Sequence, residues 1–157
     1  MESPHPFLIG GFWRRSGTTV DVVSPFDGTI AGSVELAAPD DLVDAIATVR
    51  RGAAVMRRIP APRRSAILLE MARRVAAEAN SLSDTIVGES GKTITLARAE
   101  IDRAVATLRV SADEALRIGG ELVDLDWSPA GEGCTGLLRR VPVGVVLAIS
   151  PFNYPLN

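Results

Sequence analysis

A continuous apolar run near the carboxyl end constrains the fold more than any other feature of the sequence. Residues 143–149 (Val-Gly-Val-Val-Leu-Ala-Ile) form a strand-sized stretch without a polar side chain. Such a strand is covered on both faces, which is typical of the parallel sheets of α/β proteins. A parallel neighbour is reached only through a crossover of about a dozen residues or more, and the chain ends at Asn157. We therefore expect an α/β fold of which the chain carries an incomplete part.

Three amphipathic patterns upstream of this run predict helices, which should cover residues 39–58, 62–90 and 95–118. An acidic first turn at Asp40-Asp41 marks the first start, and Gly91 marks the end of the second helix, in which we expect a kink at Asn80-Ser81. We expect the apolar stripes of all three helices to form the core. The stripes are Leu42, Ile46, Val49, Ala53 and Met56; Leu68, Met71, Ala72, Val75, Ala79, Leu82 and Ile86; and Ala97, Ile101, Ala104, Val105, Leu108, Ala112 and Ala115.

Strand patterns lie on both sides of the helices. Gly10-Gly11 joins two short apolar segments into one expected hairpin, and a turn that contains Asp27-Gly28 joins a second pair. Asp, Pro, Gly and Ser dominate residues 124–136, which predicts an exposed excursion. The expected strands are residues 7–9, 12–13, 19–23, 29–36 and 137–141.

Composition excludes several classes of partner and site. The chain is 46% hydrophobic and 23% charged, with 17 basic against 19 acidic side chains and no basic block. It therefore lacks the electrostatic footprint of a protein that binds nucleic acid or an anionic membrane, and no apolar run approaches the roughly 20 residues of a membrane span. One cysteine, Cys134, and one histidine, His5, predict neither a disulfide nor a metal site. Because the first residues lack the basic segment of a signal peptide, we expect a cytoplasmic protein.

Residues 88–93 (Gly-Glu-Ser-Gly-Lys-Thr) end like a phosphate-binding loop but fail its other requirements. A P-loop needs a glycine five residues before Gly91, where this chain has Ile86, and it follows a strand rather than a long helix. We therefore interpret Gly91 as a helix C-cap and Lys92 as a cation near the negative end of the helix dipole. The alternative, a nucleotide hydrolase, requires ATP binding that disappears in Lys92→Ala.

The most informative segment follows the apolar run, where a turn is bounded by Pro151 and Pro155. The two prolines restrict the backbone, so the side chain of Asn153 is held rigidly between them. Ligands of open α/β sheets bind at the carboxyl ends of strands, and an amide fixed there can stabilise an oxyanion. Asparagine is also common in turns, where its side chain bonds to its own backbone. A catalytic and a purely structural role for Asn153 both stay open on these grounds.

Five ordered segments carry a resemblance to a known family. They are Ile9-Gly10-Gly11-Phe12-Trp13; Val23-Ser24-Pro25-Phe26-Asp27-Gly28; Glu89-Ser90-Gly91-Lys92; Gly119-Gly120-Glu121; and Arg140-Val141-Pro142-Val143-Gly144-Val145-Val146 leading into Pro151-Phe152-Asn153-Tyr154-Pro155. The last is the most specific. In this order and spacing they resemble the amino-terminal part of the aldehyde dehydrogenase superfamily, over nearly the whole chain.

The resemblance implies an aldehyde dehydrogenase-like α/β fold, in which a Rossmann-like cofactor-binding domain carries an extension of oligomerisation strands. Residues 1–121 would supply the hairpins and helices of the cofactor-binding domain. Residues 122–141 would be the oligomerisation excursion, and residues 142–157 the first strand and turn of the dinucleotide-binding sheet. The expected cofactor is NAD or NADP, the expected substrate is a small aldehyde, and the expected assembly is a homodimer or homotetramer.

The resemblance also assigns roles to single residues. Asn153 corresponds to the asparagine that donates to the oxyanion formed when a cysteine attacks the aldehyde. Ile149, Ser150, Pro151, Phe152 and Asn153 correspond to positions that line the bound cofactor. Phe152 stands where many members have tryptophan, and the Phe-Asn-Tyr-Pro-Leu-Asn form resembles the branches that act on lactaldehyde or glyceraldehyde phosphate.

The chain departs from the family in what it does not contain. The catalytic cysteine and the general-base glutamate of the family lie outside it, and Cys134 does not stand in the nucleophile's sequence context. We therefore expect the chain by itself to lack turnover, which belongs to a complete enzyme. The alternative is a non-catalytic binding or assembly module derived from the same fold.

Overall fold

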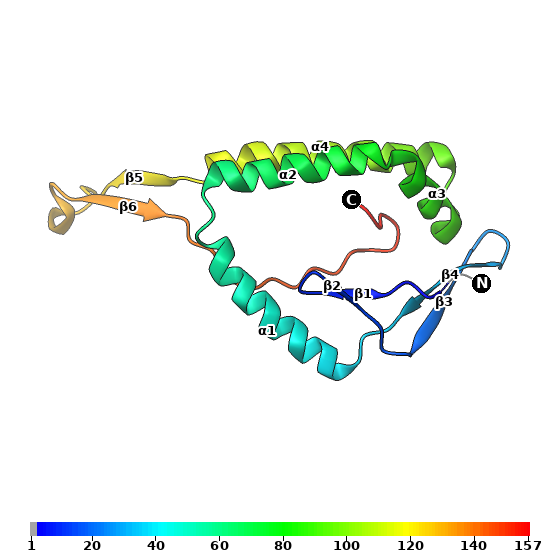
Figure 1. Ribbon diagram of the computed structural model, residues 1–157. Helices are drawn as coiled ribbons and strands as arrows, with labels where there is room; N and C mark the ends of the chain where they lie inside the picture. The colour runs from blue at the N-terminus through cyan, green and yellow to red at the C-terminus, as the bar shows by residue number, and fades with distance from the viewer. Residues whose placement is uncertain (1–2) are drawn as a thin grey trace.

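Four helices dominate the computed structural model, which describes residues 3–157 (Figure 1). The first and last predicted helices are confirmed, whereas the second divides at Glu78, whose backbone leaves helical geometry (φ −101°, ψ 17°). The kink expected at Asn80-Ser81 therefore lies at Glu78 instead. Neither glycine nor proline marks this division, and the polar pair Asn80-Ser81 indicated it only to within two residues. The helices are α1 (Pro39–Met56), α2 (Ala61–Ala77), α3 (Ala79–Ser90) and α4 (Ile94–Arg117).

The strands of the described residues form three separate antiparallel hairpins. Two of them match the predicted hairpins. The third pairs the strand expected around residues 137–141 with a strand that follows α4. The pairs are β1 (Phe7–Ile9) with β2 (Phe12–Arg14), β3 (Thr19–Val23) with β4 (Ile30–Glu35), and β5 (Gly120–Asp124) with β6 (Thr135–Arg139).

The β1–β2 turn depends on its two glycines. Gly10 and Gly11 have φ of 62° and 88°. A two-residue type I′ turn requires positive φ at both of its central residues, which glycine adopts without strain. A Cβ atom on Gly10 would also lie 2.9 Å from Cγ2 of Thr48. The glycine pair therefore closes the hairpin and allows it to lie against α1.

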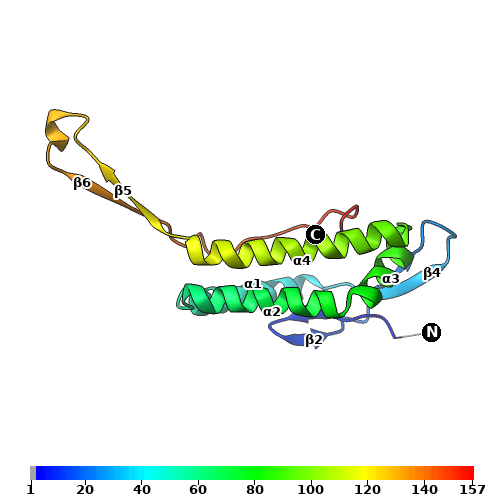
Figure 2. The ribbon, with the colours of Figure 1, turned by 90° about the horizontal axis from the view of Figure 1, so that it is seen from above.

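The core lies between α2, α3 and α4. Figures 1 and 2 show α2 and α4 side by side, with α3 across one end. Ile101 is 1% exposed and packs with Ile86 and Ala97. The predicted stripe of α4 is buried except for half-buried Leu108, which confirms this part of the predicted core. The buried apolar side chains of the helices are Ala72, Ile86, Ala97, Ile101, Ala104, Val105, Ala112 and Ala115.

The apolar stripe of α1 is exposed, so the prediction that it forms core is wrong for this structure. Leu42 exposes 61% of its surface, and no residue of α1 is buried. In Figure 1, α1 lies apart from the α2–α4 pair, and it contacts the β1–β2 hairpin, where Arg14 of β2 forms an ion pair with Asp44 of α1. An amphipathic pattern reveals that a helix has an apolar face but not which surface covers it.

Residues 143–149 form no strand within the described chain, contrary to the prediction. The segment runs from β6 back past the helices to the carboxyl end, as Figures 1 and 2 show. Val143 exposes 89% of its surface and Ile149 exposes 85%. A strand exists through ladder hydrogen bonds to a neighbour, and no described residue supplies that neighbour. The apolar run therefore keeps both of its faces uncovered.

The β5–β6 hairpin projects away from the helices (Figures 1 and 2). Its loop holds the expected exposed excursion and contains a short 3₁₀ turn, Pro129–Gly131. Leu122 and Leu137 expose 74% and 77% of their surface. A lone two-stranded ribbon has little stability of its own in water. The hairpin thus presents an apolar surface that nothing in the described chain covers.

Gly91 ends α3 in the left-handed conformation (φ 68°), which confirms the predicted C-cap. We expect Gly91→Ala to lower the free energy of unfolding by about 1–2 kcal/mol, because an L side chain is strained there. The new Cβ atom would also lie 3.1 Å from Cγ of Pro25. Gly88→Ala is the matched control: Gly88 lies inside α3 with open space around it, so alanine should add about 0.5–1 kcal/mol. Chemical denaturation measures both changes, and a loss at Gly91 no larger than at Gly88 would contradict the cap.

Candidate active site

The proline-bounded turn places Asn153 at its tip. The backbone N–H of Tyr154 donates to the carbonyl of Pro151 at 3.4 Å, which closes a four-residue turn with Asn153 at its third position. Asn153 is exposed, and its side chain has no hydrogen-bond partner among residues 3–157. The self-bonded, purely structural role is therefore not observed. An amide held on a restricted backbone with both N–H groups free can donate to an external oxygen.

Apolar side chains surround this turn on its amino-terminal side. Phe152 exposes 97% of its surface and Ile149 exposes 85%, while Ser150 and Pro151 are also exposed. The five predicted site residues are consecutive in the sequence, and all of them are exposed in the structure. Large apolar side chains uncovered in this way are typical of surfaces that pack against another molecule or another part of a protein. Such a surface can take a flat ring, and the neighbouring amide can polarise an oxygen.

The residues that follow Asn153 are bound to α4. Glu100 on α4 is 2% exposed, and its carboxylate joins two partners. One oxygen accepts from Nζ of Lys92 at 2.5 Å, and the other accepts from the backbone N–H of Leu156 at 2.9 Å. The side chain of Leu156 packs against the core cluster around Ile101. The carboxyl end of the chain is therefore fixed to the buried face of α4.

The Glu100 carboxylate stays charged in spite of its burial. Loss of solvent is the largest influence on its pKa and raises it, but the hydrogen bonds from Lys92 and from the Leu156 N–H together hold the pKa below its usual value. A carboxyl whose pKa is lower in the folded than in the unfolded state stabilises the fold at neutral pH. This stabilisation is lost as the pH falls through the folded-state pKa.

Sequence reasoning missed Glu100 and assigned Lys92 only to the helix dipole. A signal for Glu100 was present: it lies three residues after Ala97 and four before Ala104, so it stands on the buried stripe of α4. A charged residue on a buried helix face is almost always paired. The pattern therefore predicts a partner, although it does not predict which cation takes that role.

The other candidates of the sequence form no site. Residues 88–90 are the end of α3 and residues 91–93 make the turn to α4, where Oγ1 of Thr93 accepts from the N–H of Leu96 at 3.4 Å as an N-cap. This confirms a helix–turn–helix connection rather than a strand-to-helix phosphate loop.

Cys134 is exposed in the β5–β6 loop. Within residues 3–157, no cluster of three His, Cys, Asp or Glu side chains could hold a metal ion, and no helix is long and apolar enough to cross a membrane.

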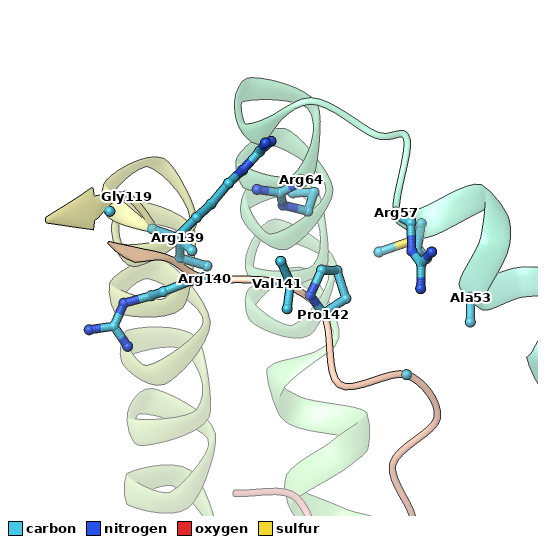
Figure 3. A pocket seen from close by; sticks show the side chains of 12 residues that line it. Ala53, Arg57, Arg64, Gly119, Arg139, Arg140, Val141 and Pro142 are labelled. Carbon is cyan, nitrogen blue, oxygen red and sulfur yellow. The ribbon is translucent and has the colours of Figure 1, made fainter. Parts of the chain in front are cut away.

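A cavity of about 600 Å³ lies away from the Asn153 turn, near the end of α4 (Figure 3). Its wall comes from the end of α1, the start of α2 and the segment after β6. Four arginines stand among the residues that line it: Arg57, Arg64, Arg139 and Arg140. None of residues 149–157 contributes to its wall. The cavity is therefore separate from the turn that carries Asn153.

Sequence comparison relates the chain to curated dehydrogenases. The putative aldehyde-dehydrogenase-like protein y4uC of Sinorhizobium fredii is 43% identical over 138 residues, which cover 88% of this chain and 27% of that protein. The 3-sulfolactaldehyde dehydrogenase of Priestia aryabhattai is 32% identical over 149 residues, covering 95% of this chain and 31% of that protein. The chain thus spans about a third or less of the length of these relatives.

Structural comparison and a family model agree with these relatives. The crystal structure of NADP-dependent glyceraldehyde-3-phosphate dehydrogenase from Bacillus halodurans, complexed with NADP, superimposes with a TM-score of 0.92 at 31% identity. The superposition covers 99% of this chain and 33% of that structure, which confirms the aldehyde dehydrogenase-like α/β fold as a partial one. The model of the aldehyde dehydrogenase family matches residues 12–157. The chain therefore belongs to the aldehyde dehydrogenase family.

Proposed function

We propose that the chain forms the cofactor-facing part of an NAD(P)-dependent aldehyde dehydrogenase that oxidises a small aldehyde to a carboxylic acid. The observation that carries the proposal is the exposed amide of Asn153, without a partner in residues 3–157, on a proline-bounded turn. The superposition on a dehydrogenase that was solved with NADP supports the choice of cofactor. Relatives named for 3-sulfolactaldehyde and for glyceraldehyde-3-phosphate support a small aldehyde as the substrate.

Asn153 acts in this proposal as an oxyanion donor. A cysteine thiolate from outside residues 1–157 adds to the aldehyde carbon, and the carbonyl oxygen becomes an oxyanion. The Asn153 side-chain N–H donates to that oxygen, and it lowers the barrier because the turn fixes the donor before the reaction begins. When bound, the nicotinamide supplies the acceptor for the hydride that the aldehyde carbon loses. Loss of this hydride from the tetrahedral adduct restores the carbonyl and leaves a thioester on the cysteine, which water hydrolyses to the carboxylic acid and the free thiolate.

The residues before Asn153 fit a nicotinamide cofactor. Ile149 and Phe152 offer exposed apolar surface to a flat ring, and Ser150 adds a hydroxyl beside them. Pro151 keeps this backbone in one conformation, which lowers the entropic cost of binding. NAD and NADP both fit, because the group that distinguishes them sits on the ribose 2′ position and is recognised after a later strand.

The same proposal assigns a role to each part of the chain. Residues 1–121 form part of the cofactor-binding domain, and residues 122–141 form an oligomerisation extension. Residues 142–157, which form no strand in this structure, would become the first strand and turn of the dinucleotide-binding sheet once the rest of the enzyme supplies a neighbouring strand. The uncovered apolar surface of β5–β6 supports assembly into a homodimer or homotetramer, since a projecting ribbon with exposed leucines gains stability from a partner. The enzyme would act in the cytoplasm.

The direct test is an assay of the product of the complete reading frame that contains this sequence. We expect it to reduce NAD or NADP in the presence of glyceraldehyde-3-phosphate or 3-sulfolactaldehyde, followed by the absorbance of the reduced nicotinamide. The chain of residues 1–157 assayed alone is the control and should be inactive, because it lacks the nucleophile. A complete product that reduces neither cofactor with any small aldehyde would contradict the proposal and favour the binding or assembly module.

A further inference from the structure

We propose that Lys92 and Glu100 are positioning residues, which orient the amide of Asn153 by fixing the residues that directly follow it. This inference deepens the proposed function and rests on it. It gives a role to Lys92, the residue that makes the α3–α4 turn look like a phosphate loop, and to the one buried carboxylate of α4.

Glu100 connects two segments that lie far apart in the sequence. Its side chain is fully buried, and that of Lys92 is 17% exposed. Because one carboxylate oxygen holds Lys92 and the other holds the N–H of Leu156, the carboxylate has a fixed orientation with both oxygens occupied. A charge-assisted hydrogen bond to a buried carboxylate is stronger than a neutral one. The backbone at Leu156 is therefore tied to α4 through a rigid group.

Tyr154 supplies a second attachment next to Asn153. Nζ of Lys92 lies 4.3 Å from the centroid of the Tyr154 ring, and Cζ of Arg103 lies 4.5 Å from it. Both distances are within the range in which a cation is attracted to an aromatic ring. Lys92 therefore binds the segment twice, directly through Tyr154 and indirectly through Glu100.

The attachments begin at the residue after Asn153. Residues 139–153 are exposed throughout, whereas Tyr154 and Leu156 contact α4 and its partners. At the carboxyl end, Asn157 and Thr107 are joined through their side chains at 2.8 Å. Asn153 is thus the last residue before the segment that is attached to α4. A shift of Tyr154 or Leu156 would therefore move the Asn153 amide directly. A displacement of about 1 Å at a reacting group can cost about 10²-fold in rate.

The first arm of the test measures the attachment itself. 3-Fluorotyrosine introduced at position 154 by nonsense suppression reports on the ring through its fluorine resonance. In the complete enzyme we expect Glu100→Gln to shift or sharpen this resonance, since the ring loses its fixed surroundings. Glu114→Gln is the matched control, because Glu114 lies on α4 with a 60% exposed side chain and should leave the resonance unchanged. An unchanged resonance in Glu100→Gln would overturn the proposal.

The second arm measures kinetic coupling to Asn153. We expect Glu100→Gln to lower kcat by about 10- to 10²-fold with little change in the KM for the aldehyde. In an Asn153→Ala background the same substitution should have almost no further effect on kcat, because the group that it positions is gone. An equal loss in both backgrounds would show a merely structural role for Glu100 and would overturn the proposal.

A third variant keeps the test decisive if Glu100→Gln fails to fold. Tyr154→Leu removes the ring but leaves the buried Lys92–Glu100 pair intact, and Tyr154 is 39% exposed. It should show the same coupling to Asn153, and the absence of coupling would overturn the proposal. The same variants distinguish a failure of the attachment from a failure of the proposed role of Asn153. If Asn153→Ala has full activity while Glu100→Gln alters the fluorine resonance, the attachment exists but the proposed role of Asn153 is wrong.

Discussion

Replacing Asn153 with alanine should lower kcat of the complete enzyme by about 10²–10³-fold, the loss typical of removing one oxyanion donor. The physical reason is that the amide interacts more strongly with the developing oxyanion than with the neutral carbonyl of the substrate. The loss should therefore appear in kcat, with the affinity for NAD or NADP changed far less. Steady-state kinetics with saturating cofactor measure the effect.

The control for this variant is Asn80→Ala. Asn80 is an exposed asparagine on α3, and its replacement should leave kcat unchanged. Circular dichroism of both variants should match that of the unaltered protein, because Asn153 has no hydrogen-bond partner to lose within residues 3–157. If Asn153→Ala kept the kcat of the unaltered enzyme, Asn153 would have no part in the chemistry.

Replacing Ile101 with alanine should destabilise the helical part of the chain by about 2–5 kcal/mol. Ile101 is 1% exposed and packs between α3 and α4 against Ile86 and Ala97, so the truncation leaves a cavity in the core. Native-state hydrogen exchange of the α4 amides measures the opening free energy of this region directly. Because Ile101 neighbours Glu100, the loss should also weaken protection of the Leu156 amide.

Val110→Ala on the same helix is the matched control. Val110 is 61% exposed, and its truncation should change the opening free energy by less than about 0.5 kcal/mol. Similar losses at Ile101 and Val110 would contradict the assignment of the core to the interface of α4 with α2 and α3.

Local features of the fold could be predicted because local physics determines them. The paired glycines of the β1–β2 turn and the cap at Gly91 both follow from positive φ, which few residues besides glycine adopt. The buried stripe of α4 follows from helical spacing. The division at Glu78 could be located only to within two residues, from the polar pair Asn80-Ser81, since neither glycine nor proline stands at the break itself.

Features that depend on distant partners were missed or predicted wrongly. The α1 stripe and the run at residues 143–149 were expected to be covered, and both are largely exposed, because the described residues supply neither a helix packed along the stripe nor a strand paired with the run. The turn around Asn153 could be located from its prolines. Its attachment through Lys92 and Glu100 could not, because a buried charge in a helix pattern predicts a partner without naming it.

A single-turnover experiment tests the central claim most directly. Complete enzyme in excess over aldehyde, preincubated with NAD or NADP, is mixed with the substrate, and the first appearance of reduced nicotinamide is followed in the unaltered protein and in Asn153→Ala. We predict that the rate of this first turnover falls by about 10²–10³-fold in the variant, since the donor acts before any product leaves. Equal first-turnover rates would contradict the claim that this chain supplies the oxyanion donor of an aldehyde dehydrogenase.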